Sequence, residues 1–152
     1  MTLEDDIAFF EQVPTFAALG KQALRILAIG AETRQLQGGA VLFYAGEPAD
    51  GGYVVQDGAL VLEPNTALSQ EQFVAGPGTL VSERALFTET VCSSTAIARG
   101  PTVVVRISRS LFRKMMEGYP EAALKLRDMM ADRVGGWMFE LGKVKRTLEK
   151  RK

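Results

Sequence analysis

The stretch Gly38–Leu62, GGAVLFYAGEPADGGYVVQDGALVL, decides the fold of this 152-residue chain. Short runs rich in valine and aromatic residues, such as AVLFYA and GYVVQ, alternate there with the turn sequences GG, GEPADGG and DG. Such runs predict β-strands, and the glycines between them predict turns. Many short strands separated by glycine indicate a β-sandwich or a β-barrel.

The same pattern extends outward over residues 31–108. The further strand-like runs are ETRQLQ, ALVLE, EQFVA, TLVS, STAIA and TVVVRIS, so we expect about eight strands in total. The sequence QDGA is expected to close a hairpin, because Asp57 and Gly58 tolerate the positive φ of a type I′ turn. The segment EPNTALSQ is expected to form a longer hairpin tip.

Helices are predicted on both sides of the strands. A helical lead-in over residues 1–30 ends at Gly30, and Ser108 or Ser110 can cap a helix after the last strand. Pro120 is expected to begin a long final helix, whose roughly 30 residues would span about 45 Å at ~1.5 Å per residue. We therefore predict a single domain over 1–152, with the lead-in at 1–30, the β-roll at 31–108 and the C-terminal helices at 109–152.

Composition excludes several function classes. The 18 basic and 18 acidic residues cancel, so no global charge attracts nucleic acid or a membrane surface. The absence of histidine removes most acid–base catalysis near neutral pH and most transition-metal sites. The single cysteine cannot form an internal disulfide, and the acidic N-terminus MTLEDDIAFF contains no long apolar run. We therefore expect a cytoplasmic, non-enzymatic protein with no metal and no cofactor.

The candidate site is the segment Leu80–Ala98, LVSERALFTETVCSSTAIA. It begins as a strand, breaks at SERALF and returns as a strand at STAIA. One carboxylate, Glu83, lies at the break, and several hydroxyls and the thiol of Cys92 follow it. The segment can be a pocket that grips a small ligand, or the remains of such a pocket.

From about Phe9 to about Gly136 the chain resembles the cyclic nucleotide-binding domain family. The similarity rests on the double-glycine strand region quoted first, with Gly39, Gly46 and Gly58 at the turns of the family's roll. It rests also on GPGTLVSERALF, which resembles the entry to the family's phosphate-binding cassette, and on the exit sequence VVVRISRSLFRKMMEGYP.

The resemblance implies an α+β, mainly β fold. That fold is an eight-stranded double-stranded β-helix, or jelly roll, flanked by N-terminal helices and a long C-terminal helix. It also implies a cyclic nucleotide such as cAMP as the candidate ligand, held by a cassette-like segment at residues 78–95.

The physics of such a cassette explains which residues the resemblance assigns to the ligand. In the family a carboxylate accepts the ribose 2′-hydroxyl, the N–H groups of a short helix face the cyclic phosphate, and an arginine pairs with that phosphate. By resemblance, Glu83 is the ribose carboxylate, and Ala85 and Leu86 belong to the short helix. Ser93 matches the Ser/Thr beside the arginine.

Three positions depart from the family pattern. Ser82 stands where the family has glycine, Cys92 where it has the phosphate arginine, and Ser94 where it has alanine. Losing a charge-assisted contact of about 3 kcal/mol weakens binding about a hundredfold or more. The resemblance therefore implies a divergent cassette that binds a cyclic nucleotide weakly or binds another ligand. The positions concerned are Ser82, Glu83, Ala85, Leu86, Cys92, Ser93 and Ser94.

Each of these features also has a plainer interpretation. Glu83 can be a solvated carboxylate at the start of a helical turn. Cys92 can be a small buried packing residue, which is the commoner role of a lone cysteine. Arg84 is expected to point outward, and Arg99 lies beyond the following strand, so neither is expected to replace the missing arginine.

The final helix carries a second signal. Its apolar residues alternate steps of four and three, which is typical of a coiled-coil seam, and this predicts a homodimer. The alternative is a helix that packs its apolar side onto its own roll. In the resembling regulators this helix pairs two subunits and covers the ligand pocket. The seam consists of Met130, Val134, Trp137, Leu141, Val144 and Leu148.

Several functions follow from these patterns. The first is a regulatory or sensor module of signalling with a divergent pocket. The second is a scaffold that uses the final helix, or the basic tail KVKRTLEKRK, for dimerisation or partner binding without a nucleotide. In the resembling regulators a helix-turn-helix domain follows the long helix. Because this chain ends at Lys152, we expect no DNA binding by that route. An enzyme is not expected, because no catalytic motif is present.

Overall fold

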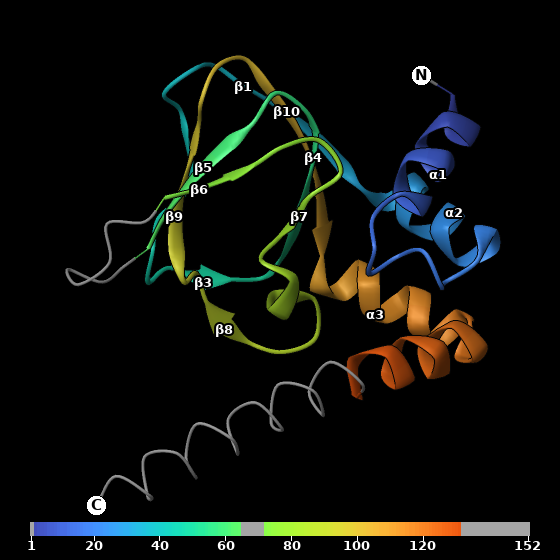
Figure 1. Ribbon diagram of the computed structural model, residues 1–152. Helices are drawn as coiled ribbons and strands as arrows, with labels where there is room; N and C mark the ends of the chain where they lie inside the picture. The colour runs from blue at the N-terminus through green and yellow to red at the C-terminus, as the bar shows by residue number, and fades with distance from the viewer. Residues whose placement is uncertain (1, 65–71, 132–152) are drawn as a thin grey trace, which may run out of the picture.

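The structure is a computed structural model that describes residues 2–64 and 72–131, and it is a β-roll with helices along one side (Figure 1). The helices are α1 (Leu3–Glu11), α2 (Lys21–Gly30), the short 3-10 helix η1 (Glu83–Leu86) and α3 (Arg109–Gly118), and residues 120–131 are also helical. The strands are β1 (Glu32–Leu36), β2 (Val41–Phe43), β3 (Pro48–Ala49), β4 (Gly51–Asp57), β5 (Leu60–Pro64), β6 (Phe73–Ala75), β7 (Leu80–Val81), β8 (Thr90–Val91), β9 (Ser94–Ala98) and β10 (Thr102–Ser108).

The strands form two antiparallel sheets and one small ribbon. One sheet has the order β1-β10-β4-β7, the other has the order β2-β9-β5-β6, and β3 pairs with β8. The predicted jelly roll is therefore confirmed, and each of the eight predicted strands has a counterpart. The sequence did not predict β3 and β8, because these two-residue strands lie inside segments that are typical of loops.

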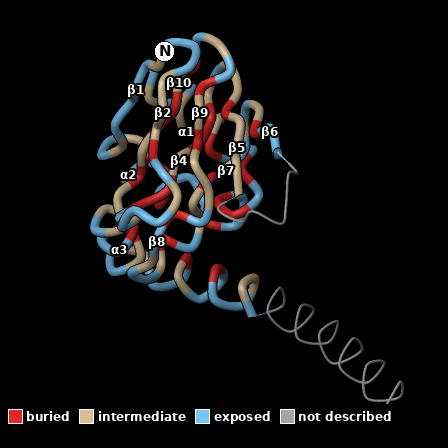
Figure 2. Tube along the Cα trace, turned by 90° about the vertical axis from the view of Figure 1, so that its left-hand side faces the viewer, coloured by how far each residue is buried: buried red, intermediate tan, exposed pale blue. Residues whose placement is uncertain are grey.

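The two central strands of the first sheet are covered on both faces. In β4, Val54 packs into a core shared with the helices, whereas its neighbour Val55 packs into a second core inside the roll. In β10, Val105 packs into the core shared with the helices and Val104 into the core inside the roll. Successive side chains of a strand point to opposite faces, so the consecutive valines of YVVQ and VVVR are explained by burial on both sides. Buried positions accordingly run along the central strands (Figure 2).

One turn differs from its prediction. The sequence Asp57–Gly58 was expected to close a hairpin, but β4 pairs with β10 and β7, whereas β5 pairs with β6 and β9. The hairpin prediction is wrong, because this turn carries the chain from one sheet to the other. Only Gly58 has a positive φ, at 79°, and the turn is therefore not type I′. A β-carbon at Gly58 would lie 2.5 Å from the carbonyl oxygen of Pro101, which excludes larger residues.

The helices begin and end largely where the sequence predicted. α2 ends at Gly30, and Ser108, rather than Ser110, caps α3 by accepting a hydrogen bond from the Leu111 N–H at 3.1 Å. The last described helix includes Pro120 as its first residue. No helix in the described part of the chain is both long enough and apolar enough to cross a membrane.

Most of the predicted dimer seam lies outside the described residues. Met130 is described, and it packs at the edge of the core that the helices share with the roll. The other seam positions, Val134, Trp137, Leu141, Val144 and Leu148, lie beyond residue 131. Homodimerisation therefore stays a prediction.

Candidate functional site

The cassette-like segment begins with an unusual backbone conformation at Ser82. This residue has φ 63° and ψ 37°, and among the described residues other than glycine it alone has a positive φ. The left-handed conformation turns the chain from β7 directly into η1. It disfavours every residue that has a β-carbon, and glycine adopts it freely. This explains in physical terms why a glycine is the natural residue at this position, as the resemblance implied.

We predict that Ser82→Gly stabilises the protein. The substitution removes the steric penalty of the left-handed conformation, and we expect a gain of about 1 kcal/mol in the free energy of unfolding. For a chain of this size the midpoint of thermal unfolding should rise by about 2–4 °C, which calorimetry can measure. The same substitution at Ser94, which lies in strand β9, should instead destabilise by about 0.5–1 kcal/mol. Equal effects at the two positions would contradict the prediction.

Glu83 is the first residue of η1, and it contacts the N-terminal lead-in. Its carboxylate accepts a hydrogen bond from the hydroxyl of Thr15, which lies 68 residues earlier in the chain. Thr15 is only 2% exposed and belongs to the turns between α1 and α2. The structure therefore places the predicted ribose carboxylate against the helices of its own chain.

The rest of η1 is anchored by Arg109, the first residue of α3. The Arg109 guanidinium donates from Nε to the carbonyl oxygen of Ala85 at 2.8 Å and from a terminal nitrogen to that of Ala49 at 2.5 Å. Ala85 and Leu86 are each 1% exposed, and Leu86 packs in the core shared with the helices. The short helix is thus held by its backbone and by its apolar side chains.

Cys92 follows strand β8 and points into the other core, inside the roll. It is 5% exposed, and its backbone is fixed on both sides by the turn at Gly46 and Glu47, through two hydrogen bonds of 2.8 Å. Burial raises the pKa of the thiol, and the negative charges of Glu47 and Asp50 raise it further. The thiol is therefore kept neutral, which supports the interpretation of Cys92 as a packing residue.

Ser82 and Cys92 meet at one small cavity of about 110 Å³. Two carboxylates, Glu47 and Asp50, belong to its wall, and none of the described residues that line it is a lysine or an arginine. Binding sites for small molecules usually measure about 300–1,000 Å³, so this cavity is smaller than a typical site for a nucleotide-sized ligand. The lining residues are Leu42, Phe43, Glu47, Pro48, Ala49, Asp50, Gly51, Tyr53, Ser82 and Cys92.

Arg106, an arginine beside this cavity, is engaged by one of the carboxylates of the cavity wall. The guanidinium of Arg106 lies 2.7 Å from the carboxylate of Asp50, and this contact lowers the pKa of Asp50. Arg106 itself is largely buried, at 15% side-chain exposure, on strand β10. It is paired with a carboxylate of the wall and does not belong to the lining of the cavity.

The remaining positions lie away from the cavity. Ser93 and Arg84 are exposed, and Ser94 is partly buried in β9, where it pairs with Pro64 of β5. The outward position of Arg84 confirms its predicted direction, and Arg99 is exposed in the turn after β9. Of the seven predicted site residues, the structure therefore brings only Ser82 and Cys92 to one cavity.

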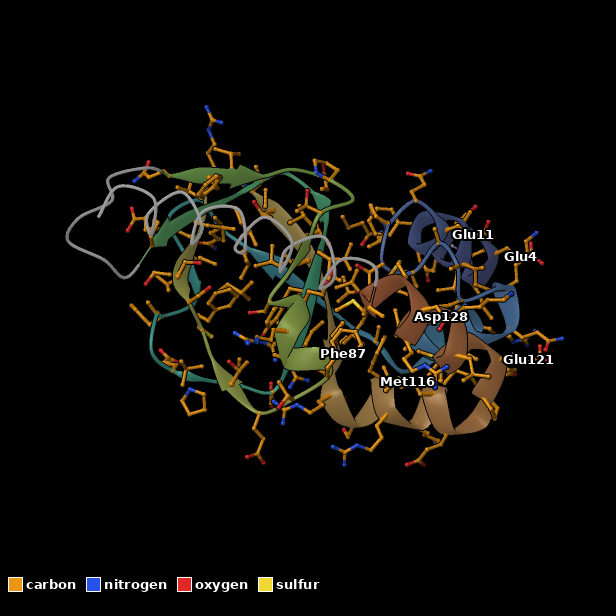
Figure 3. The ribbon with its side chains drawn as sticks, turned by 60° about the horizontal axis from the view of Figure 1, so that its bottom comes forward. Glu4, Glu11, Phe87, Met116, Glu121 and Asp128 are labelled. Atoms are coloured by element: carbon orange, nitrogen blue, oxygen red, sulfur yellow. The ribbon has the colours of Figure 1, made fainter. Side chains whose placement is uncertain are left out.

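An apolar groove lies beside the C-terminal end of η1. Phe87, which directly follows η1, and Met116 of α3 lie close together between the roll and the helices (Figure 3), and they line a groove of about 520 Å³. The other lining residues come from the last described helix: Ala123, Leu126, Arg127, Met130 and Ala131. Phe87 thus places the end of η1 beside the last described helix.

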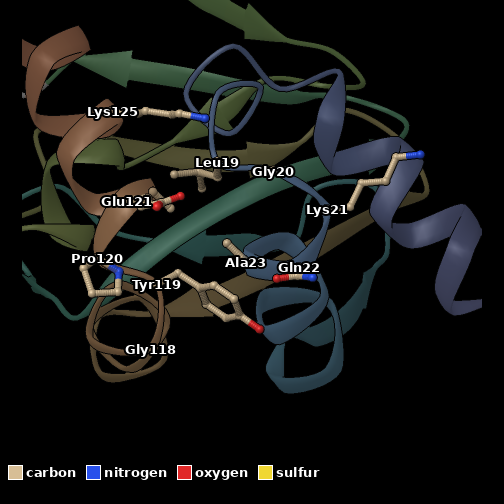
Figure 4. Close-up of a pocket in the computed structure, with 11 residues that line it drawn as sticks. Leu19, Gly20, Lys21, Gln22, Ala23, Gly118, Tyr119, Pro120, Glu121 and Lys125 are labelled. Atoms are coloured by element: carbon tan, nitrogen blue, oxygen red, sulfur yellow. The ribbon is translucent and has the colours of Figure 1, made fainter.

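A larger cavity of about 620 Å³ lies between α2 and the final helix (Figure 4). It contains no residue of the cassette-like segment. Glu121 and Tyr119 lie along one side of it, whereas the amine of Lys21 points away from them (Figure 4). This mixture of charges at a distance from the cassette does not identify a ligand.

Sequence reasoning missed the residues that surround the cassette. Thr15 and Arg109 contact η1 from distant parts of the chain, and no local pattern marks either of them. Glu47 and Asp50 belong to the turn GEPADGG, where their carboxylates could have been noticed, but only the pairing of β3 with β8 places them beside Cys92.

Comparisons with known proteins agree with this architecture. The family model described as "Cyclic nucleotide-binding domain" matches residues 33–119. A solved cyclic nucleotide-binding-like protein from Brucella abortus is 36% identical, covers 74% of this chain and 98% of its own, and has a TM-score of 0.66. The N-terminal domain of a transcriptional regulator from Streptomyces coelicolor is 26% identical, covers 84% and 91%, and has a TM-score of 0.76.

Curated relatives are much longer than this chain. Lysophospholipase NTE1 from the fungus Pyricularia oryzae is 30% identical over 108 residues, and its counterpart from Chaetomium globosum is 29% identical over 105 residues. Each match covers 68% of this chain but only 7% of the fungal enzyme. The shared part is therefore a small segment of each lysophospholipase.

Proposed function

Because the chain belongs to the cyclic nucleotide-binding domain family, we propose that it is a non-enzymatic regulatory or sensor module with a divergent pocket. In this proposal the pocket binds cyclic nucleotides weakly, or binds another small ligand. The observation that carries the proposal is the buried, neutral Cys92 at the position that the resemblance assigns to the phosphate arginine.

The charges around the cavity support weak binding of an anion. A cyclic phosphate entering beside Ser82 and Cys92 would approach the carboxylates of Glu47 and Asp50 with no lysine or arginine in the described lining. Both carboxylates are exposed to solvent and Asp50 is already paired with Arg106, so this repulsion is screened and modest. A nucleotide therefore has to enlarge the cavity without gaining a cationic partner for its phosphate from the described lining.

Calorimetric titration with cAMP, cGMP and a cyclic dinucleotide tests the proposal directly. We expect saturable heat with a dissociation constant of order 0.1–1 mM for at least one of them. Losing a contact of about 3 kcal/mol would weaken micromolar binding about a hundredfold, to this range. The noncyclic 5′-AMP is the control for unspecific binding of a nucleotide. The absence of heat and of any thermal shift at millimolar ligand would reject the sensor, and nanomolar binding would reject the divergent pocket.

The second candidate is a scaffold or interaction protein without a nucleotide ligand. The small volume of the cavity, about 110 Å³, is the observation that favours it. In that case the roll supports the C-terminal helix, which provides dimerisation or partner binding. The same titration separates the two functions, because the scaffold requires no response to any nucleotide.

The sensor proposal includes a homodimer formed through the C-terminal helix, and the scaffold proposal allows one, which makes a prediction at Val144. Val144→Asp should convert the protein to a monomer in sedimentation experiments, because it places a charge in the predicted apolar seam. Arg146→Asp provides the control, since the spacing puts position 146 away from the seam. If Val144→Asp leaves the sedimenting mass unchanged, the seam is rejected.

A further inference from the structure

Thr15 and Glu83 join the N-terminal lead-in to the start of η1. The buried Thr15 hydroxyl donates its hydrogen bond to the Glu83 carboxylate, and Glu83 is absent from the lining of the cavity that Ser82 and Cys92 share. An ionised carboxylate only accepts hydrogen bonds, and its natural partner in a sugar is a hydroxyl. The Thr15 hydroxyl is therefore the same kind of donor as a ribose hydroxyl.

The lead-in also reaches the other end of the short helix. Phe16, the neighbour of Thr15, contacts Phe112 of α3 with ring centroids 6.2 Å apart. Phe112 in turn contacts Phe87, just after η1, edge to face at 5.3 Å. Arg109 binds the middle of η1 at the carbonyl oxygen of Ala85. The helical layer therefore holds η1 at its start, its middle and its end.

We infer that the Thr15 hydroxyl is an internal competitor for the ligand hydroxyl at Glu83. This inference rests on the proposed function, since it concerns the regulation of the same pocket. A ligand that uses Glu83 has to displace Thr15, and its binding releases the lead-in from the cassette. The residue pair then sets both the selectivity for a hydroxyl-bearing sugar and the coupling between the pocket and the N-terminal helices.

The test compares cAMP with 2′-deoxy-cAMP in the intact chain and in Thr15→Val. Valine keeps the shape of threonine but donates no hydrogen bond. A hydrogen bond to a charged group stabilises by about 1.5–3 kcal/mol, so we expect Thr15→Val to bind cAMP about tenfold more tightly. Binding of 2′-deoxy-cAMP should not change, because that nucleotide lacks the hydroxyl that competes for Glu83. Thr15→Ser, which keeps the hydroxyl, should behave like the original protein.

The outcomes separate this inference from the proposed function. If cAMP binds but its preference over 2′-deoxy-cAMP is equal in Thr15→Val and in the original chain, the competition is rejected and the sensor stands. If none of the variants binds either nucleotide, Cys92→Arg included, the proposed function is rejected and the competition with it.

A measurement without ligand tests the contact itself. In a double-mutant cycle of Thr15→Val and Glu83→Ala, which removes the acceptor, the coupling should change the unfolding equilibrium constant by about fivefold or more. The matched control is Thr102→Val, which removes another buried hydroxyl, one that donates to backbone carbonyl oxygens at Gly100 and Ala59. Thr102→Val should show no coupling to Glu83→Ala. The absence of coupling in the Thr15 cycle would show that this hydrogen bond does not hold the lead-in against the cassette-like segment.

Discussion

Cys92→Arg is expected to raise the affinity for cAMP about a hundredfold. The guanidinium would supply the cation that the described lining of the cavity lacks, and a charge-assisted pair with the cyclic phosphate provides about 3 kcal/mol. The wall already contains carboxylates that can hold an arginine, because Glu47 and Asp50 lie close enough to Cys92 to raise the pKa of its thiol. Calorimetric titration of the variant with cAMP measures the gain.

A second variant separates charge from size at this position. Cys92 is 5% exposed, and a longer side chain there has to enlarge the cavity, at a cost of about 1–3 kcal/mol in stability. Cys92→Met imposes a similar strain without a charge. The arginine variant should therefore bind cAMP much more tightly than the methionine variant. Equal affinities in two folded variants would show that the pocket cannot receive a phosphate.

Phe112→Ala is expected to produce the largest loss of stability. Phe112 is fully buried in α3, between Phe16 of the lead-in and Phe87 of the cassette-like segment. Truncating a buried phenylalanine to alanine destabilises by about 3–5 kcal/mol, which is a large part of the total stability of a domain. Urea unfolding should show this loss as a lower midpoint with an unchanged slope.

The control for this prediction lies on the opposite side of the molecule. Phe73 is 61% exposed on strand β6, so Phe73→Ala should change the free energy of unfolding by less than about 1 kcal/mol. Comparable losses in the two variants would contradict the central position of Phe112. A smaller loss for Phe112→Ala would also weaken the proposed coupling of η1 to the lead-in.

The sequence predicted the fold from local signals. Runs of valine and aromatic residues marked eight strands, and Gly30 and Ser108 marked where one helix ends and another begins. These signals are local because strand propensity, turns and caps depend on residues a few positions apart. The two-residue strands β3 and β8 were not predicted, because their pairing comes from tertiary contact rather than from a hydrophobic run.

The sequence predicted which segment forms the candidate site, but not how the residues of that segment are arranged in space. Ser82 and Cys92 were identified as departures from the family pattern, and both line the same cavity. The sequence could not show that Glu83 contacts Thr15 or that Arg109 holds Ala85, because hydrogen bonds between distant residues leave no local pattern.

The sequence by itself determined a sandwich or barrel of short strands with flanking helices, the jelly roll through its family resemblance, and the absence of an arginine at position 92. Only the tertiary structure decided that Leu86 packs with the helices whereas Cys92 packs inside the roll. The physical reason is that the segment lies between the two cores, so that Val81 packs inside the roll, Leu86 with the helices and Cys92 inside the roll again. Burial on the two sides of one short segment depends on what packs against each side, and the order of residues does not specify that.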